Sequence, residues 1–319
     1  MGRTASCEGR WEGLSRMKRK FHVRFLGGGE AAMPPCYPTF EGVVSLLRGR
    51  VAVVTGASRG IGKGIALALG EAGATIYVTG RSDQGSTTEG LPGTARDTAD
   101  AVTQRGGQGV PVRCDHAADA EVEALFARVM QEQGHLDLLV NNAWGGYEQQ
   151  DWSRFGAPFW EQPLRHWPGM FESGVRAHLA ATRLAVPLML SRGRGLIVHT
   201  TAWDRDRYLR NLFYDVAKAA VNRMAFGMAR ELEPHHIAVV ALAPGFVGTE
   251  RVRAAVAGAG GTPGNLESPE YIGRAVVALA GDANVMARSG QVLTVGQLAR
   301  EYGFTDVDGR QWPPFQIEA

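Results

Sequence analysis

A run of apolar residues followed by a glycine-rich turn and a helical pattern constrains the fold of this chain more than any other feature. Residues 51–55 form a continuous apolar run, which is typical of a parallel strand covered on both faces. Gly56-Ala57-Ser58-Arg59-Gly60-Ile61-Gly62 follows, then apolar residues at helical spacing, then a second β-rich run over 75–79. This order of strand, glycine turn, helix and strand predicts the first βαβ unit of a dinucleotide-binding fold.

The end of the second strand indicates which dinucleotide the turn would hold. Glycines let backbone N–H groups approach a pyrophosphate, and the helix N-terminus favours its negative charge. An acidic residue about 20 residues further on would bind the ribose 2′-hydroxyl of NAD, whereas arginine accommodates the 2′-phosphate of NADP. Arg81 stands there, and Arg59 adds a cation within the turn. Two guanidiniums would clamp one phosphate, so we favour NADP over NAD; the alternative is two solvated surface arginines.

Strands and helices continue to alternate as far as residue 295. The sequence predicts an α/β fold: a single Rossmann-type doubly wound domain with a mostly parallel seven-stranded sheet. We place this NAD(P)-binding catalytic domain over residues 49–297, between a disordered basic extension, 1–48, and a C-terminal tail, 298–319. The later helices are expected over 94–105, 117–133, 170–191, 212–233 and 268–280, the last with Ser268 as its N-cap.

Charge and cysteine content limit the classes of protein to which the chain can belong. Residues 1–50 hold nine Lys or Arg and four Glu, so their net charge is +5 and, from the total of +2, that of the remainder is −3. A slightly acidic body argues against nucleic acid as a partner, with a basic arm over 1–48 as the open alternative. Three cysteines without metal-ligand spacing favour a reducing compartment, and no run approaches the roughly 18 apolar residues of a membrane span. We expect a cytoplasmic protein with no metal and no membrane partner.

Tyr214 and Lys218 lie four residues apart, so on a helix they share one face. Asn211 is a candidate N-cap for that helix. A tyrosine has a reference pKa of about 10, and a nearby cation lowers this pKa. The pair is therefore a candidate acid/base centre, although the same spacing also occurs on ordinary surface helices.

Residues 144–168 hold four of the seven tryptophans, namely Trp144, Trp152, Trp160 and Trp167. An aromatic loop beside a strand end would wall a pocket for a bulky apolar substrate. The alternative is that the aromatic side chains anchor a long loop on the body or fill a subunit contact.

The chain resembles the short-chain dehydrogenase/reductase family over about residues 49–297. It contains, in order, Thr55-Gly56-x-x-x-Gly60-x-Gly62, Asn141-Asn142-Ala143, Tyr214-x-x-x-Lys218 and Pro244-Gly245. The resemblance implies hydride transfer between NAD(P) and a small-molecule carbonyl or alcohol in a homo-oligomeric enzyme. Tyr214 would exchange the proton at the substrate oxygen, and Lys218 would bind the nicotinamide ribose and lower the tyrosine pKa. The other implied cofactor-binding residues are Gly56, Gly60, Ile61 and Gly62 at the pyrophosphate, Asp115 and Asn142 at the adenosine, and Pro244, Gly245 and Thr249 at the nicotinamide. Ser58 in the glycine turn is a further candidate for cofactor binding, beside Arg59 and Arg81 at the 2′-phosphate.

Two positions depart from the pattern of that family. The family usually has serine thirteen residues before the tyrosine, where this chain has Thr201, with Thr200 as the neighbouring alternative. Threonine keeps the hydroxyl that polarises a carbonyl, but its χ1 is stiffer. The family commonly has an asparagine on the preceding helix, where our best match is Gly174. These departures motivate a second hypothesis, a catalytically weak NADPH-binding regulatory or scaffold protein.

Overall fold

A single parallel sheet forms the centre of the computed structural model, which describes residues 46–83, 85–148, 150, 152–203, 207–258 and 266–316. Nearly all of the predicted extension 1–48 lies outside these residues. Within them, seven strands pair in the order β3-β2-β1-β4-β5-β6-β7, and all six pairings are parallel. The strands are β1 (Val51–Val54), β2 (Thr75–Gly80), β3 (Gln108–Arg113), β4 (Leu138–Asn141), β5 (Gly195–Thr200), β6 (Ile237–Ala243) and β7 (Val292–Thr294). The predicted doubly wound α/β fold is confirmed.

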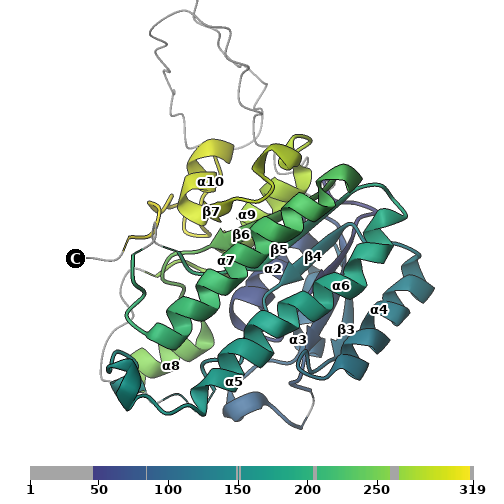
Figure 1. Ribbon diagram of the computed structural model, residues 1–319. Coiled ribbons are helices and arrows are strands. Elements are labelled where there is room, and N and C mark those ends of the chain that lie inside the picture. The colour runs from purple at the N-terminus through teal and green to yellow at the C-terminus, as the bar shows by residue number, and fades with distance from the viewer. Residues whose placement is uncertain are drawn as a thin grey trace, which may run out of the picture. The chain divides into compact units, whose positions relative to one another are not determined.

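Helices cover both faces of the sheet (Figure 1). Successive side chains of a strand point to opposite faces, so Val54 enters one core and Val53 the other, and neither is exposed to solvent. The first core is closed by α2 (Gly60–Glu71), α3 (Ala95–Gln104), α9 (Pro269–Gly281) and α10 (Val295–Tyr302). The second is closed by α4 (Asp119–Gln133), α6 (Ala177–Leu190) and α7 (Leu212–Leu232). The remaining helices are η1 (Thr88–Gly90), η2 (Trp152–Arg154), η3 (Phe159–Glu161), α5 (His166–Met170), η4 (Phe171–Arg176), η5 (Glu233–His235), α8 (Glu250–Gly258) and η6 (Val285–Arg288).

Helices α2 and α9 touch backbone to backbone. A Cβ atom at Gly64 would lie 2.1 Å from the carbonyl carbon of Pro269, and one at Gly273 would lie 2.6 Å from the carbonyl oxygen of Gly64. Both distances are far below a van der Waals contact, so only glycine allows the two helices to approach this closely. The helix that follows the glycine turn is thereby fixed against the C-terminal part of the fold.

Two predicted helix starts are confirmed, and the single helix expected over 170–191 is wrong in where it begins and in its regularity. Asn211 caps α7 and Ser268 caps α9, each through a side chain that accepts the backbone N–H three residues later. The helix expected over 170–191 instead begins with α5, widens into the π-helical turn η4 and continues as α6. The wide turn contains Gly174, against which the side chain of Trp144 packs.

The C-terminal segment packs on the body of the domain rather than beginning a separate tail at residue 298. The expected boundary falls inside α10, where Leu298 and Ala299 are fully buried. Further on, the Trp312 amide donates to the Tyr271 hydroxyl at 3.1 Å and its indole donates to Asp306 at 2.7 Å. These contacts hold the chain against α9.

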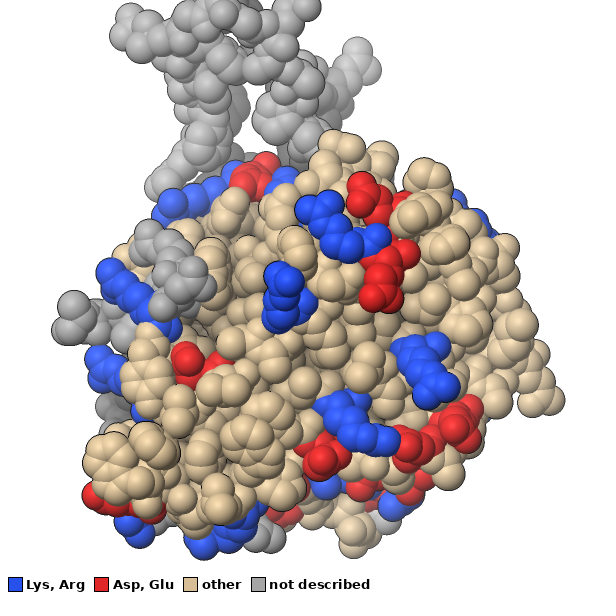
Figure 2. Space-filling view, viewed as in Figure 1, with Lys and Arg blue, Asp and Glu red and all other residues tan. Residues whose placement is uncertain are grey.

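Charged side chains of both signs are interspersed on the face of the molecule that includes α6 and α7. Figure 2 shows no extended patch of a single sign among the described residues visible from this side. In the part of the chain that the structure describes, no helix combines the length and the apolar character needed to cross a membrane.

Candidate active site

The glycine turn lies at the carboxyl edge of the sheet, between β1 and β4, where the strand order reverses. Asn142 ties the turn together, because its side-chain amide donates to the carbonyl oxygens of Thr55 at 3.0 Å and Gly56 at 3.1 Å. A Cβ atom at Gly62 would lie 2.4 Å from the Gly56 oxygen, so the first turn of α2 can reach this position only with glycine. In open α/β sheets this crevice is the place where ligands bind.

A carboxylate marks an anion site at the N-terminus of α2. Glu250 accepts a hydrogen bond from the backbone N–H of Gly60 at 2.8 Å. Glu250 begins α8, whose first turn is capped by the Thr249 hydroxyl through the amide of Val252 at 3.3 Å. Backbone N–H groups at a helix N-terminus also bind phosphate, so this geometry fits the pyrophosphate of a dinucleotide.

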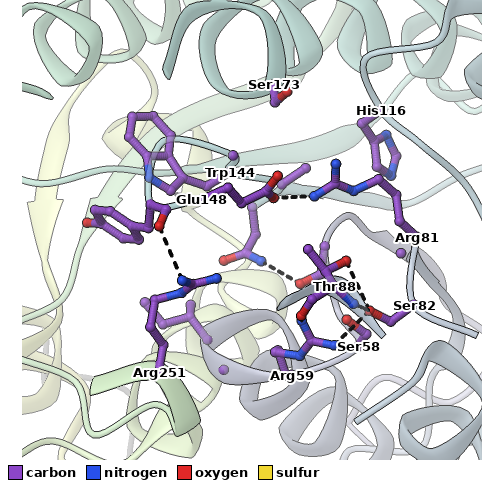
Figure 3. A pocket seen from close by; sticks show the side chains of 18 of the residues that line it. Ser58, Arg59, Arg81, Ser82, Thr88, His116, Trp144, Glu148, Ser173 and Arg251 are labelled. Atoms are coloured by element: carbon purple, nitrogen blue, oxygen red, sulfur yellow. Dashed lines mark hydrogen bonds and ion pairs between the residues drawn. The ribbon is translucent and has the colours of Figure 1, made fainter. Parts of the chain in front are cut away.

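Three guanidinium groups surround the same pocket, those of Arg59, Arg81 and Arg251 (Figure 3). Arg59 is held by the segment 82–93, where it donates to the Ser82 hydroxyl at 2.7 Å and to three backbone carbonyls. Arg81 forms an ion pair with Glu148, and Arg251 pairs with Glu89. Burial lowers the pKa of Arg59, and repulsion from Arg251 and Arg81 lowers it further, against the opposing effect of Glu250. The three guanidinium groups are thus matched by carboxylates in and around the pocket, so an incoming phosphate would have to compete with Glu148 for Arg81 and with Glu89 for Arg251.

Most of the predicted cofactor-binding residues line this one pocket: Gly56, Ser58, Arg59, Gly60, Ile61, Arg81, Asp115, Asn142 and Thr249. Gly62, Thr201, Tyr214, Lys218, Pro244 and Gly245 do not line it. Gly62 packs inside the turn, and the Gly245 amide donates to the buried carboxylate of Glu267 at 2.9 Å. The cavity has a volume of about 220 Å³, below the roughly 300–1,000 Å³ of typical ligand pockets.

Tyr214 and Lys218 lie on one face of α7, as predicted, with the Lys218 Nζ atom 5.6 Å from the centre of the tyrosine ring. Asn211 fixes the start of this helix, because its side-chain oxygen accepts the Tyr214 amide at 2.9 Å. Its side-chain amide also donates to the Phe155 carbonyl at 2.7 Å and to Gln162 at 2.8 Å. The same residue thus holds both the tyrosine helix and the aromatic segment.

Aromatic side chains cover the tyrosine. The rings of Trp144, Tyr147 and Phe155 have their centres 5.7, 6.0 and 6.0 Å from that of Tyr214, and Trp152 lies 5.3 Å from Tyr147. Trp167 instead stacks on Phe171 near the body. The four tryptophans of residues 144–168 therefore have different environments. Trp144 and Trp152 belong to the cluster around Tyr214, Trp167 anchors residues 144–168 to the body of the domain, and Trp160 is largely exposed.

The predicted lowering of the tyrosine pKa is not found in this conformation. Burial raises the pKa of Tyr214 well above its usual value, and its hydrogen bond with the Tyr147 hydroxyl adds to this effect. Burial also lowers the pKa of Lys218 to about 7. The prediction considered only the attraction between phenolate and ammonium. Removal of both groups from water disfavours both charges and outweighs that attraction.

The Thr201 hydroxyl is turned toward α7, where it donates to the side-chain oxygen of Asn222 at 2.7 Å. A hydroxyl has a single proton to donate, so Thr201 must leave Asn222 before it can polarise a carbonyl. The Thr200 hydroxyl lies 3.5 Å from the Asn142 side-chain oxygen, which is a weak contact.

Sequence reasoning missed Glu148, Glu250, Arg251 and Trp144 as residues around the cofactor pocket. Glu148 and Arg251 come from segments more than 100 residues apart, and only the fold brings them together. Glu250 carries one signal that was available, since it directly follows the predicted cofactor residue Thr249 and begins a helix. The tryptophan-rich composition of residues 144–168 indicated that Trp144 could line a substrate pocket, but it did not indicate that Trp144 lines the cofactor pocket.

A doubly wound parallel sheet with a glycine turn, an arginine-lined crevice and a Tyr–Lys helix at its carboxyl edge defines a class of dinucleotide-dependent oxidoreductases. Comparison with known proteins identifies the family. Residues 50–259 match the family model described as short chain dehydrogenase. The chain belongs to the short-chain dehydrogenase/reductase family and is an NAD(P)-dependent oxidoreductase.

Three relatives illustrate the similarity. Dehydrogenase/reductase SDR family member 1 of Mus musculus is 42% identical over 281 residues, which cover 84% of this chain and 86% of the relative. A 7α-hydroxysteroid dehydrogenase solved with NADH and 7-oxo glycochenodeoxycholic acid is 27% identical, with a TM-score of 0.66 and coverage of 84% and 97%. A metagenomic short-chain oxidoreductase solved with NADP is 27% identical, with a TM-score of 0.61 and coverage of 78% and 97%.

Proposed function

We propose that this protein is an NADP-dependent carbonyl reductase or alcohol dehydrogenase in which Tyr214 is the general acid/base. The observation that carries the proposal is the Tyr214–Lys218 pair, with Lys218 buried and Tyr214 partly buried, beside an arginine-lined dinucleotide pocket. The preference for NADP is supported by Arg81, which directly follows β2 where an NAD-specific protein would carry an acidic residue, and by Arg59 of the glycine turn; both line the pocket. One solved relative holds NADP and another holds NADH, so the preference rests on the two arginines.

The bound nicotinamide supplies or accepts the hydride, and the side chains of α7 handle the proton. Burial raises the pKa of Tyr214, so in this conformation the phenol is the proton donor that carbonyl reduction needs, and alcohol oxidation would require a conformation in which the phenolate is stabilised. Lys218 lies one helical turn away and would bind the nicotinamide ribose. Thr201, released from Asn222, would donate a hydrogen bond to the same carbonyl oxygen.

The aromatic side chains near Tyr214 support an apolar, ring-containing carbonyl or alcohol as substrate. Trp144, Tyr147, Trp152 and Phe155 would form its walls, because apolar and aromatic side chains line most small-molecule sites. We also retain the expectations of a homo-oligomer and of a cytoplasmic location; Cys114, the cysteine within the described residues, is a buried free thiol.

The test is NADPH oxidation with a panel of aromatic and alicyclic ketones and aldehydes. Tyr214→Phe should lower turnover by roughly 10²–10⁴-fold, which is the usual contribution of general acid–base catalysis, while NADPH binding persists. Tyr208→Phe is the matched control, since Tyr208 lies on the same segment but is 55% exposed. Equal turnover in the wild type and the Tyr214 variant would disprove the role of the tyrosine.

A further inference from the structure

Gly174 and Trp144 are complementary in shape. A Cβ atom at residue 174 would lie 2.6 Å from Cζ3 and 2.7 Å from Cε3 of the Trp144 indole. Real Cβ atoms do not approach carbon so closely, so any other residue at 174 would displace the ring. Nearby, a Cβ atom at Gly145 would lie 2.7 Å from that of Ser173, so the loop and η4 fit closely together on both sides of the indole.

Displacement of the Trp144 ring would matter because the indole covers Lys218. The Nζ atom lies 3.8 Å from the centre of the Trp144 ring, well within the roughly 6 Å range of a cation–π contact. The edge of the same tryptophan meets Tyr214, with ring planes at 89°. Among the described residues, Lys218 has no carboxylate within ion-pairing distance, so the indole face is its main electrostatic partner.

We propose that Trp144 is a positioning residue for Lys218, and that Gly174 provides the space it needs. The indole face holds the ammonium group beside Tyr214 and keeps water from it on that side. The proposal rests on the proposed function, in which Lys218 binds the cofactor ribose.

The other titratable groups around Lys218 do not offer a competing charge. Tyr214 on the same helix and Tyr147 on the aromatic loop are neutral phenols, because burial raises the pKa of both. His178 on α6 and His199 on β5, whose rings lie side by side, are neutral because burial lowers the pKa of both, to about 3 for His199. Two rings favour the charged lysine, and the indole face at 3.8 Å lies much closer to the Nζ atom than the Tyr214 ring at 5.6 Å.

The composition of the chain allows a direct test. The chain has four lysines, Lys18, Lys20, Lys63 and Lys218, so an NMR spectrum of lysine-labelled full-length protein has four ε-methylene signals, and Lys218→Met assigns one. Protons above a ring face are shifted upfield. We expect an upfield-shifted Lys218 signal in the wild type that is retained in Trp144→Phe and lost in Trp144→Leu. Gly174→Ala should also abolish the upfield shift, because the added methyl group displaces the indole although residue 144 is still tryptophan.

The energetic role is tested by replacing all seven tryptophans with 5-fluorotryptophan, which weakens the ring face without a change of shape. The Lys218 pKa should fall by about 0.3 pH units in the wild type and remain constant in Trp144→Phe. The proposal would be overturned if the Lys218 signal of the wild type were not shifted upfield, or if Gly174→Ala kept the upfield shift. It would also be overturned if fluorination lowered the Lys218 pKa equally in the wild type and in Trp144→Phe. None of these measurements uses cofactor or substrate, so their failure is distinct from failure of the proposed reductase activity.

Discussion

Substitution of Arg81 by alanine should change cofactor selectivity by an amount that the structure allows us to bound. A hydrogen bond between charged groups contributes about 1.5–3 kcal/mol. Before it can bind a 2′-phosphate, Arg81 must leave Glu148, and with side chains 36% and 28% exposed that pair is worth only about 0.2–1 kcal/mol. The net loss of about 1–2 kcal/mol predicts NADPH binding about 5–30-fold weaker in Arg81→Ala.

The assay is a titration of NADPH and NADH at fixed ionic strength, because exposed charges are screened by salt. NADH lacks the 2′-phosphate, so its dissociation constant should change by less than about twofold. Arg81 is a cleaner choice than Arg59, whose four hydrogen bonds to segment 82–93 also hold the pocket wall. Glu148→Gln is the matched control and should tighten NADPH binding by releasing Arg81. Equal weakening of both cofactors, or tighter binding of NADH by the wild type, would refute the reasoning.

Two further predictions concern stability. Asn211→Ala removes a helix cap and leaves the partners of a fully buried amide unpaired, which should cost about 2–3 kcal/mol and lower Tm by about 3–5 °C. Asn211→Asp, which keeps the capping oxygen, should lose less, and an unchanged Tm in Asn211→Ala would contradict the assigned contacts. Burial raises the pKa of Glu267 to about 7, so this residue contributes most stability below its unfolded pKa of about 4.5, and that contribution is lost as pH rises to 7. The Tm of Glu267→Gln relative to that of the wild type should therefore rise by a few degrees between pH 5 and pH 8. A Tm difference that does not vary with pH would contradict the raised pKa of Glu267.

The sequence predicts those parts of the site that are local in the chain. The apolar run before Gly56 and the helical spacing of Tyr214 and Lys218 depend on neighbours within one or two turns, and the structure shows the sheet and the helix that these patterns indicate. The electrostatics of the tyrosine could not be predicted in this way. Its pKa depends on an aromatic segment about 60 residues earlier in the chain, which removes the phenol from water.

The same limit applies to the arginine-lined pocket. Arg81 was found because it follows a strand directly, whereas its partner Glu148 lies 67 residues further along the chain. The π-helical turn around Gly174 was missed for a related reason. Periodicity describes one helix at a time, and the irregularity lies at the contact of η4 with the indole of a distant loop.

The seam between α2 and α9 has a consequence for how new specificities arise in this fold. Since Gly64 and Pro269 already touch, the first turn of α2 cannot retreat from an incoming ligand. Space must come from the opposite wall, where Glu250 and Glu148 are held by single side-chain contacts. The wall formed by α2 thus fixes where phosphate groups are bound, while Glu148 and Glu250 on the other wall can be substituted more readily. Changes at Glu148 and in α8 can alter which molecule is accepted without disturbing the fixed wall or the contact of Trp144 with Gly174.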